Sequence, residues 1–197
     1  MADYTFFTNP MSRGQIARWA LHEAGADYQD ALVPWDAKPK ALLQANPMGK
    51  VPTIIHHVDG QDRVVSEAAA SCAYLAEMHP EAGLRPNDAQ MADYFRWFFF
   101  AAGPVEAVLT NRALGFDLPA DKAMMAGWGS FERTMDTLGG HLAKVTFVCG
   151  NNFTMADVYV GSQVDWGLTF GSIPPEPELV AYAERIQARP HYKAAKG

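Results

Sequence analysis

Apolar and polar residues follow two different rhythms over the first eighty residues of the chain. Short β-branched or aromatic runs predict strands, and apolar positions that recur every three to four residues predict helices between them. Asn9-Pro10 is a turn pair, Gly25 is a helix stop and Asp59-Gly60 is a hairpin signal. The predicted strands are 4–8, 28–33, 53–58 and 63–65, the predicted helices are 12–24 and 67–78, and 40–45 is predicted as a short helix or turn.

The pattern changes after residue 80, where proline, glycine and polar residues predict a linker and later segments show helical periodicity only. A long aromatic-rich helix is expected over 91–114, with Gly103-Pro104 kinking or interrupting it. Further helices are expected between about 120 and 142, from 154, and over 177–188. The change predicts an α/β domain over 1–80, a linker over 81–87 and an all-α helical domain over 88–197.

Composition narrows the class of protein. Of the 197 residues 49% are apolar, so a substantial core is available, and the formal net charge is −6. No basic run is present, which argues against nucleic acid or an anionic membrane as the main partner. The first residues do not resemble a secretory signal, and the apolar run around Trp97–Ala102 is too short to span a bilayer. We therefore expect a soluble cytoplasmic protein.

The cysteines and histidines do not predict a metal site. Cys72 and Cys149 fit no metal or redox spacing, which in the cytoplasm indicates reduced thiols. His56 and His57 are adjacent on a predicted strand, so their side chains face opposite sides and cannot chelate one ion together. The other histidines are scattered. We expect no metal cofactor.

A Val-Pro step stands in front of a β-branched strand in the segment NPMGKVPTII, residues 46–55. Proline cannot donate to a sheet ladder, so Pro52 belongs at a strand's first residue, an edge or a bulge. The bond before it is one of the few that adopts cis at modest cost. One interpretation is a strand that merely starts at a proline. The other is that Val51 leaves its N–H and C=O unpaired, so that a peptide-like ligand adds to this edge as a short strand.

Ser12 stands where the first strand turns into the first helix. Ser12-Arg13-Gly14-Gln15 matches a capping box, in which the serine accepts from a backbone N–H and Gln15 reaches back. A capping hydroxyl can still donate another hydrogen bond, and a helix N-terminus favours an anion. A thiolate bound there would gain from both, with its pKa lowered from about 8.5 towards neutrality. Ser12 is thus either a helix cap alone or also the group that stabilises a thiolate.

Glu67 and three lysines are candidates for contacts with charged ligand groups. An acid in the first turn of a helix ordinarily complements the helix dipole. Alternatively, the Glu67 carboxylate holds a ligand's ammonium group while nearby helix N–H groups hold its carboxylate, as an α-amino acid end requires. Lys38, Lys40 and Lys50 are either solvated surface charges or the local cluster that meets a ligand carboxylate in an otherwise acidic chain.

Two sequence features of the helical half indicate roles in folding and packing more than roles in binding a ligand. Thr154 and Asp157 have the spacing of a capping box, and Phe153 and Val158 have the spacing of the hydrophobic staple around it. The run 96–104 carries aromatic residues all round a helix, which predicts that most of them are buried. One or two of them could line an apolar pocket that faces the first domain.

Four segments follow one another in a specific order: Ser12-Arg13-Gly14, residues 46–52, residues 66–75, and FTMAD at 153–157. Each is weak alone, but their order and spacing in one chain are specific. Together they resemble the cytosolic glutathione transferase family, with the closest likeness to bacterial members. The likeness covers nearly the whole chain.

The resemblance implies a thioredoxin-like N-terminal domain followed by an all-α helical domain, usually paired as a homodimer. It implies a cis bond between Val51 and Pro52. The backbone of Val51 would pair with the cysteinyl part of glutathione, the co-substrate. Glu67 and the N–H of Ala68 would hold the γ-glutamyl end.

The remaining binding positions show one departure from the family. Lys38 and Lys50 align with positions that often contact the glycyl end of glutathione or the nearby backbone. Many relatives have Glu-Ser at the γ-glutamyl site, whereas this chain has Glu67-Ala68. The lost hydroxyl is worth about 0.5–1.5 kcal/mol unless Ser66 compensates for it.

The residue that activates the thiol is a second departure. No tyrosine ends the first strand and no cysteine opens the first helix. Ser12 is the first candidate, with Asn9 and Thr8 behind it. The electrophile pocket would combine side chains from several segments, and the candidates are Met11, Trp97, Phe100 and Trp166.

We therefore expect a glutathione transferase that conjugates the glutathione thiolate, stabilised near Ser12, to a small hydrophobic electrophile. Two alternatives stay open: a non-catalytic glutathione- or ligand-binding protein on the same scaffold, and a glutathione-dependent isomerase or dehalogenase. Glutaredoxin-like thiol exchange is less favoured, because no cysteine stands at the start of the first helix.

Overall fold

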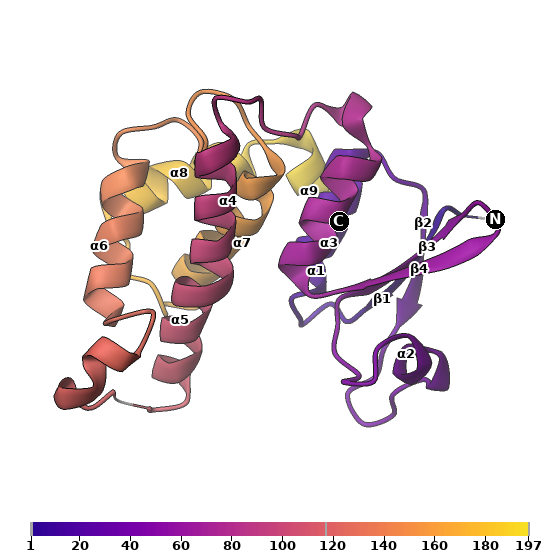
Figure 1. Ribbon diagram of the computed structural model, residues 1–197, viewed down its shortest axis with the longest axis horizontal. Coiled ribbons are helices and arrows are strands. Elements are labelled where there is room, and N and C mark those ends of the chain that lie inside the picture. The colour runs from indigo at the N-terminus through magenta and orange to yellow at the C-terminus, as the bar shows by residue number, and fades with distance from the viewer. Residues whose placement is uncertain (1, 117, 197) are drawn as a thin grey trace. The chain divides into compact units, whose positions relative to one another are not determined.

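The chain forms two compact units in the computed structural model, which describes residues 2–116 and 118–196 (Figure 1). The first unit contains the chain up to Arg85 together with the segment from Arg189 onward, and the second spans Pro86–Ala188. The elements of the first unit are β1 (Tyr4–Thr8), α1 (Gly14–Ala24), β2 (Tyr28–Leu32), α2 (Lys40–Ala45), β3 (Thr53–Val58), β4 (Gln61–Ser66), α3 (Ala68–Met78), the 3₁₀ segment η1 (Pro80–Ala82) and α9 (Pro190–Lys196).

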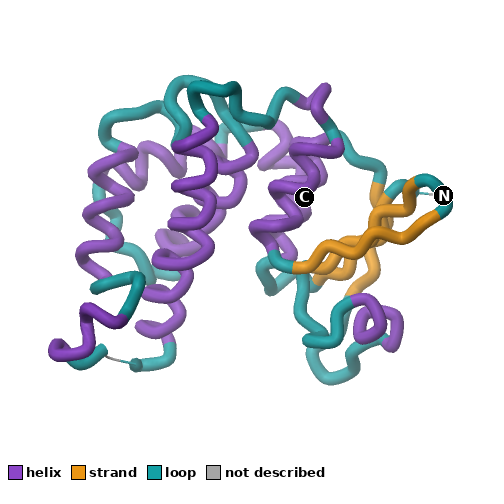
Figure 2. The backbone as a smooth tube through the Cα atoms, in the orientation of Figure 1, coloured by secondary structure: helices purple, strands orange, loops and turns teal. Residues whose placement is uncertain are grey.

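One mixed sheet with the strand order β2-β1-β3-β4 forms the centre of the first unit. β1 pairs parallel with β2 and antiparallel with β3, which pairs antiparallel with β4. Successive side chains face opposite sides, so Phe6 lies under Arg18 of α1 whereas Phe7 packs with Leu42 of α2. Helices α1 and α3 cover one face and α2 covers the other (Figures 1 and 2). This confirms the expected thioredoxin-like α/β fold.

Strand register brings several loops to the same end of the sheet. Phe7 pairs with Thr53, and Thr53 pairs with Ser66. The residues that follow β1, precede β3 and follow β4 therefore lie next to one another. Thr8 pairs with Leu32 in the parallel neighbour, so the loop after β2 leaves from this end as well. We call this end of the sheet the loop edge.

The last helix, α9, belongs to the first unit, whereas the sequence pattern predicts a helical domain over all residues from 88 onward. The Glu23 side chain on α1 is only 1% exposed and is paired with the Arg189 guanidinium through two hydrogen bonds of 2.7 Å. Trp19 and Tyr192 meet edge to face at 5.1 Å. A buried carboxylate needs a charged partner, and this one comes from a distant part of the sequence.

The second unit is built from helices. Its elements are α4 (Met91–Phe100), the π-helical segment η2 (Ala101–Val105), α5 (Glu106–Ala113), the 3₁₀ segment η3 (Ala120–Met125), α6 (Phe131–Leu142), α7 (Met155–Thr169) and α8 (Pro177–Gln187). The expected interruption at Gly103-Pro104 is confirmed, because both residues fall inside η2 and proline has no N–H for the helical ladder. A continuous helix between 120 and 142 is wrong: Trp128 and Gly129, which has a φ of 67°, separate η3 from α6.

Helix α7 is almost entirely buried and begins at the capping box that the sequence predicts. The Asp157 carboxylate accepts hydrogen bonds from the N–H groups of Val148 at 2.7 Å and Thr154 at 2.9 Å. It also accepts one from the hydroxyl of Tyr182 at 2.9 Å. The staple between Phe153 and Val158 stays a prediction. Across the described residues, no helix combines the length and apolar character needed to cross a membrane.

Candidate functional site at the loop edge

Asn9 and Ser12 hold the turn between β1 and α1. The Asn9 side-chain oxygen accepts from the N–H of Met11, and its amide nitrogen donates to the carbonyl of Val33, both at 2.9 Å. The Ser12 hydroxyl donates to the carbonyl of Asn9 at 2.6 Å and accepts from the N–H of Gly14 at 2.9 Å. These bonds fix the turn and tie it to the end of β2.

The capping box predicted at Ser12 is wrong. Gln15 donates its side-chain amide to the carbonyl of Pro10 at 3.1 Å, while the Ser12 N–H donates to the carbonyl of Asn9. A serine hydroxyl has one proton, and here it is directed at Asn9. Since Ser12 is only 8% exposed, its hydroxyl can donate to a bound sulfur only by giving up that carbonyl.

Thr8, the third candidate for activating a thiol, is buried at the end of β1. Its side chain faces the start of α1, because a Cβ on Gly14 would collide with Thr8 Oγ1. Glycine is therefore required at this close approach between strand and helix. Thr8, Asn9 and Ser12 all lie at the same corner of the loop edge.

Asn46 fixes the loop that enters β3. Its amide nitrogen donates to the Thr53 hydroxyl at 3.1 Å and to the Lys50 carbonyl at 3.3 Å. The Thr53 hydroxyl in turn donates to the Lys50 carbonyl at 2.9 Å. The Val51–Pro52 bond that follows is cis, as predicted. Sequence reasoning did not single out Asn46 or Thr53, because an Asn-Pro pair indicates a turn without showing what the amide contacts.

Val51 presents its backbone at the loop edge. Pairing between β1 and β3 begins at Thr53, and no hydrogen bond to the N–H or C=O of Val51 is found among the described residues. The register of β3 and β4 places Val51 and Pro52 beside the chain that leaves Ser66. An extended peptide-like ligand can pair with such an edge.

Glu67 stands at the N-terminus of α3 with φ of 70° and ψ of 128°. A positive φ is costly for a residue with a side chain and is found disproportionately at ligand sites. The N–H of Ser71 donates to the Glu67 carbonyl at 2.9 Å, so the N–H groups of Ala68, Ala69 and Ala70 have no partner within the helix. An exposed carboxylate thus lies beside helix N–H groups.

The Lys38 side chain lies beside the loop that carries Lys50. Gly49 has a φ of 60°, and a Cβ at this position would lie 2.9 Å from Cδ of Lys38. The Lys38 side chain therefore crosses the backbone directly before Lys50. Both lysines are exposed. Lys40 is the first residue of α2.

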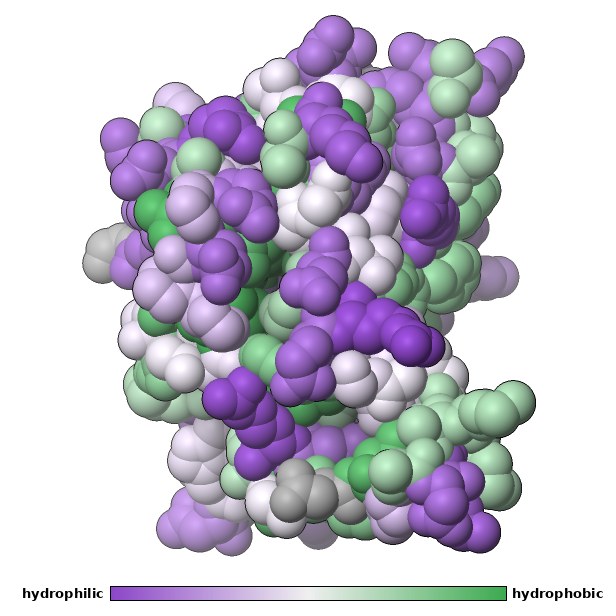
Figure 3. Space-filling view, turned by 90° about the vertical axis from the view of Figure 1, so that its left-hand side faces the viewer, coloured by the Kyte–Doolittle hydropathy of each residue, from purple (hydrophilic) through white to green (hydrophobic). Residues whose placement is uncertain are grey.

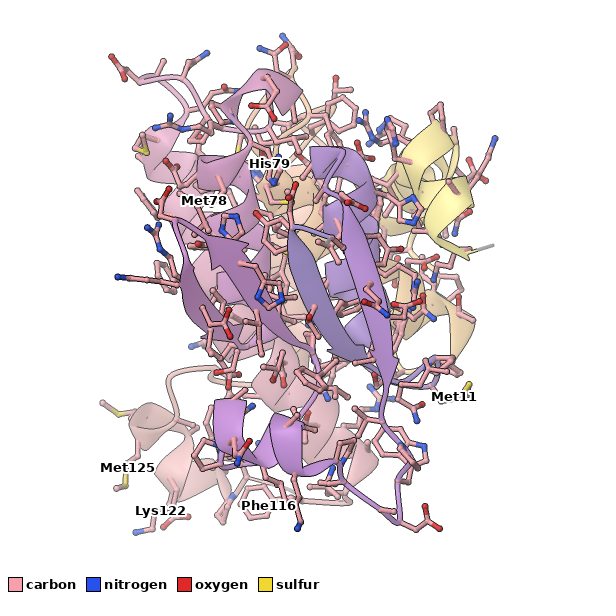
Figure 4. All side chains as sticks on the ribbon, turned by 90° about the vertical axis from the view of Figure 1, so that its right-hand side faces the viewer. Met11, Met78, His79, Phe116, Lys122 and Met125 are labelled. Atoms are coloured by element: carbon pink, nitrogen blue, oxygen red, sulfur yellow. The ribbon has the colours of Figure 1, made fainter. Side chains whose placement is uncertain are left out.

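The residues predicted for the electrophile pocket have different surroundings. Met11 is 74% exposed and projects from the β1–α1 turn (Figure 4). Trp97 is 1% exposed and lies in the core of the second unit, stacked on His141 at 4.0 Å and edge to face with Phe100 at 5.3 Å. Trp166 is partly exposed. The structure joins Trp97 with Phe100, and the role of the four residues stays a prediction.

Neither cysteine has the surroundings of a reactive thiol. Cys72 is fully buried in α3, and burial raises its pKa strongly. Burial likewise raises the pKa of Cys149 to about 12. Both are thiols at neutral pH, so a nucleophilic sulfur at this site has to come from a ligand.

His56 and His57 have separate partners on opposite faces of the sheet. His56 stacks on Tyr4 at 4.3 Å, whereas His57 is hydrogen-bonded to the Thr5 hydroxyl at 2.8 Å. Within residues 2–116 and 118–196, no group of three or more potential ligands of the His, Cys, Asp and Glu types is placed to hold a metal ion.

Comparison with known proteins matches both halves of the chain. A family model described as glutathione S-transferase, N-terminal domain, matches residues 11–78, and one described as glutathione S-transferase, C-terminal domain, matches residues 120–166. Glutathione S-transferase 3 of Zea mays is 29% identical over 209 residues, which cover 98% of this chain and 87% of the relative.

Solved structures show the same architecture. A glutathione transferase from Methylococcus capsulatus is 26% identical with a TM-score of 0.79, covering 98% of this chain and 97% of that one. A sphingomonad glutathione S-transferase complexed with glutathione is 27% identical with a TM-score of 0.77, covering 98% and 96%.

Relatives with other names are also similar. Probable elongation factor 1-gamma 2 of Arabidopsis thaliana is 23% identical over 89% of this chain and 43% of its own length. A probable maleylacetoacetate isomerase of Caenorhabditis elegans is 36% identical over 86 residues, 43% of this chain and 38% of the relative. Since the two domain descriptions match in order along one chain whose fold agrees with both, the protein belongs to the glutathione transferase family.

Proposed function

We propose that the protein binds glutathione at the loop edge and transfers its thiolate to a small hydrophobic electrophile. The observation that carries this proposal is the unpaired backbone of Val51 beside the N-terminus of α3. A strand-like edge next to free helix N–H groups suits a short peptide whose end carries both an ammonium and a carboxylate group.

Glutathione matches this arrangement group by group. Its cysteinyl part would pair with the backbone of Val51, and its γ-glutamyl ammonium group would meet Glu67. The γ-glutamyl carboxylate would accept from the N–H of Ala68 and its neighbours, with Ser66 as a further hydroxyl. Lys38 and Lys50 would meet the glycyl carboxylate, an attraction needed because the chain carries a net charge of −6.

The corner formed by Thr8, Asn9 and Ser12 would receive the sulfur. The N-terminus of α1 favours a thiolate over a thiol. The thiolate attacks the electrophilic carbon, the new S–C bond forms, and the leaving group departs with its electron pair. The thiol proton is released on ionisation, so no general base is required.

Replacing Glu67 tests the binding mode. Glu67→Gln removes the charge that would meet the ammonium group, and we expect calorimetry to show about tenfold weaker glutathione binding. Glu77→Gln is the matched control, since Glu77 is an exposed residue of α3 that pairs with Arg85. Equal losses in both variants, or no glutathione binding by the wild type, would contradict the proposal.

Replacing Ser12 tests thiol activation. In Ser12→Ala we expect the apparent pKa of bound glutathione thiol to rise by about one unit and turnover to fall, while Ser12→Thr retains part of the effect. Ultraviolet absorbance of the thiolate and the pH–rate profile report this directly. An unchanged profile in Ser12→Ala would remove Ser12 from the role and leave it as a support of the turn.

Two alternative functions use the same scaffold. A non-catalytic binding protein is favoured by the Ser12 proton being committed to Asn9 and by the similarity to elongation factor 1-gamma. Glutathione binding without conjugation of any electrophile in a broad panel would support it. A glutathione-dependent isomerase or dehalogenase is suggested by the maleylacetoacetate isomerase relative, and substrate profiling separates it from conjugation.

We also propose that two copies associate as a homodimer. On α4, Phe95 is 51% exposed and Phe99 is 70% exposed, and their rings stack with centroids 6.4 Å apart. Adjacent exposed aromatic rings are a feature of interaction surfaces. Light scattering should give a mass near twice that of the chain, and a mass of one chain would contradict this.

A further inference from the structure

Two side chains hold the carbonyl oxygen of Lys50, the residue directly before Val51. The Thr53 hydroxyl donates to this oxygen at 2.9 Å, and the side-chain amide of Asn46 donates to it at 3.3 Å. The same amide donates to the Thr53 hydroxyl at 3.1 Å, so the three groups are mutually hydrogen-bonded. We call Asn46 and Thr53 together the carbonyl clamp.

Both residues of the carbonyl clamp are buried and belong to regular elements or their ends. Thr53 is 0% exposed and is the first residue of β3. Asn46 is 7% exposed, and its N–H donates to the carbonyl of Leu42 in α2 at 2.7 Å. Its side-chain oxygen accepts from the N–H of Met48 at 3.1 Å. The position of the Lys50 carbonyl is therefore set by the end of α2 and the start of β3.

The planar peptide group between Lys50 and Val51 transmits this constraint to the Val51 N–H. The bond is trans, and in a trans peptide group the C=O and N–H lie in one plane and point in opposite directions. Because the Lys50 carbonyl is directed at Asn46 and Thr53, the Val51 N–H is directed away from them. In the described part of the chain no acceptor is found for this N–H, and Val51 is partly exposed.

We propose that Asn46 and Thr53 are positioning residues for glutathione, because they aim the Val51 N–H at the carbonyl of the cysteinyl part. This inference rests on the proposed function, in which the backbone of Val51 pairs with that part. Hydrogen bonds weaken steeply as they depart from linearity. A peptide group that is free to rotate would therefore pair less well with glutathione, although neither side chain of the carbonyl clamp touches the ligand.

Thr53→Val tests the carbonyl clamp, because valine keeps the shape of threonine and lacks the hydroxyl. We expect calorimetry to show about three- to tenfold weaker glutathione binding, the value of one hydrogen bond. Thr53→Ser keeps a hydroxyl and should restore most of the affinity. The apparent pKa of the bound thiol should stay at its wild-type value in both variants, because the corner that would receive the sulfur belongs to a different loop.

Asn46→Asp is a second variant of the carbonyl clamp. Aspartate keeps an acceptor for the Met48 N–H and lacks the amide that donates to Lys50. We expect glutathione binding to weaken at least as much as in Thr53→Val. In nuclear magnetic resonance spectra, saturating glutathione should shift the Val51 amide signal of the wild type, and the shift should be smaller in either variant.

Thr134→Val provides the matched control in the second unit. Thr134 is 2% exposed, and its hydroxyl donates to the Trp128 carbonyl at 2.9 Å, as Thr53 does to Lys50. It belongs to α6, which lies on the side of the second unit that Figure 3 shows. The control removes the same kind of buried hydrogen bond. It should lower the urea midpoint about as much as Thr53→Val and leave glutathione affinity unchanged.

The outcomes separate the carbonyl clamp from the binding mode on which it rests. Wild-type affinity in Thr53→Val and Asn46→Asp, an equal loss of affinity in Thr134→Val, or no recovery in Thr53→Ser would overturn the positioning role alone. A raised thiol pKa in Thr53→Val would do the same, since it would show a general disturbance of the site. Absence of glutathione binding by the wild type would overturn both the positioning role and the proposed function.

Discussion

His56 lies inside a group of aromatic and basic side chains on the first unit. It stacks on Tyr4, and its Nδ1 lies 2.9 Å from the Tyr74 hydroxyl. Burial, followed by the nearby charges of His79 and Arg63, lowers its pKa below the usual 6.5. The neutral ring is therefore favoured in the folded state more than in the unfolded state.

This shift predicts a loss of stability in mild acid. With the folded-state pKa below 6.5, the unfolded chain binds the proton more tightly, so stability is full above that pH and declines as the pH falls below it. We expect a lower urea midpoint at about pH 5.5 than at about pH 7.5, and a weaker dependence in His56→Gln. His191→Gln, at an exposed position, is the control. If the urea midpoint of His56→Gln depends on pH as strongly as that of His191→Gln, His56 is not the group responsible.

Residue-level predictions succeed where a residue type has few possible partners. The opposite faces of His56 and His57 follow from backbone chemistry, and the structure agrees. The cis bond before Pro52, which the structure also contains, is implied by the family resemblance and not by backbone chemistry alone. Ser12 is different, because its hydroxyl can pair with several nearby groups. The spacing to Gln15 favours a capping box, but the Ser12 hydroxyl accepts from the N–H of Gly14 and the Gln15 side chain donates to the Pro10 carbonyl instead.

At the scale of elements, the start of α7 depends on one buried carboxylate. Asp157 joins two backbone N–H groups and the Tyr182 hydroxyl. In Asp157→Ala these buried donors lose their acceptor, and we expect a loss of about 3 kcal/mol in the free energy of unfolding. Asp136→Ala, at an exposed position of α6, should cost less than about 0.5 kcal/mol. Similar denaturation midpoints for the two variants would contradict this role.

The same carboxylate has a pH dependence opposite in sign to that of His56. Burial raises the pKa of Asp157 from 3.8 to about 6. Because the pKa of Asp157 is higher in the folded state, its contribution to stability is full below the pKa of the unfolded chain. That contribution is lost as the pH rises through the pKa of the folded state. The interval between about pH 4 and about pH 6 is therefore where ionisation of Asp157 opposes folding.

Sequence patterns predict elements well where the periodicity is long and local signals agree. The strands of the first unit and the start of α7 at Thr154 are of this kind. The sequence pattern does not predict the split between η3 and α6, because it continues the helix through Gly127-Trp128-Gly129. Helix α9 was missed because its seven residues show little periodicity and its position depends on Arg189 and Tyr192 contacting α1.

For the whole molecule, the segment from Arg189 onward connects the end of the chain to its beginning. The guanidinium forms a two-bond pair with Glu23, which also accepts from the Trp19 indole at 2.9 Å. Removing one partner of a buried pair leaves an uncompensated charge. In Arg189→Ala we expect a loss of about 3 kcal/mol from the first unit, seen as faster hydrogen exchange in α1.

A variant of α9 that leaves the Glu23–Arg189 pair intact separates loss of the pair from a general effect of substitution in this helix. Lys193→Ala changes an exposed residue of α9 and should leave exchange in α1 unchanged. The double variant Glu23→Ala with Arg189→Ala should cost less than the sum of the single losses, because the two residues interact directly. Additive losses would mean that the pair itself contributes no coupling.

At Val51 and the start of α3, the loop edge offers main-chain N–H and C=O groups beside its polar side chains. Main-chain atoms are present whatever side chain a position carries. A substitution therefore alters them only by changing the position or conformation of the backbone. A binding surface of this kind depends on how the loops are folded, and two solved structures share this fold at 26% and 27% identity to the chain.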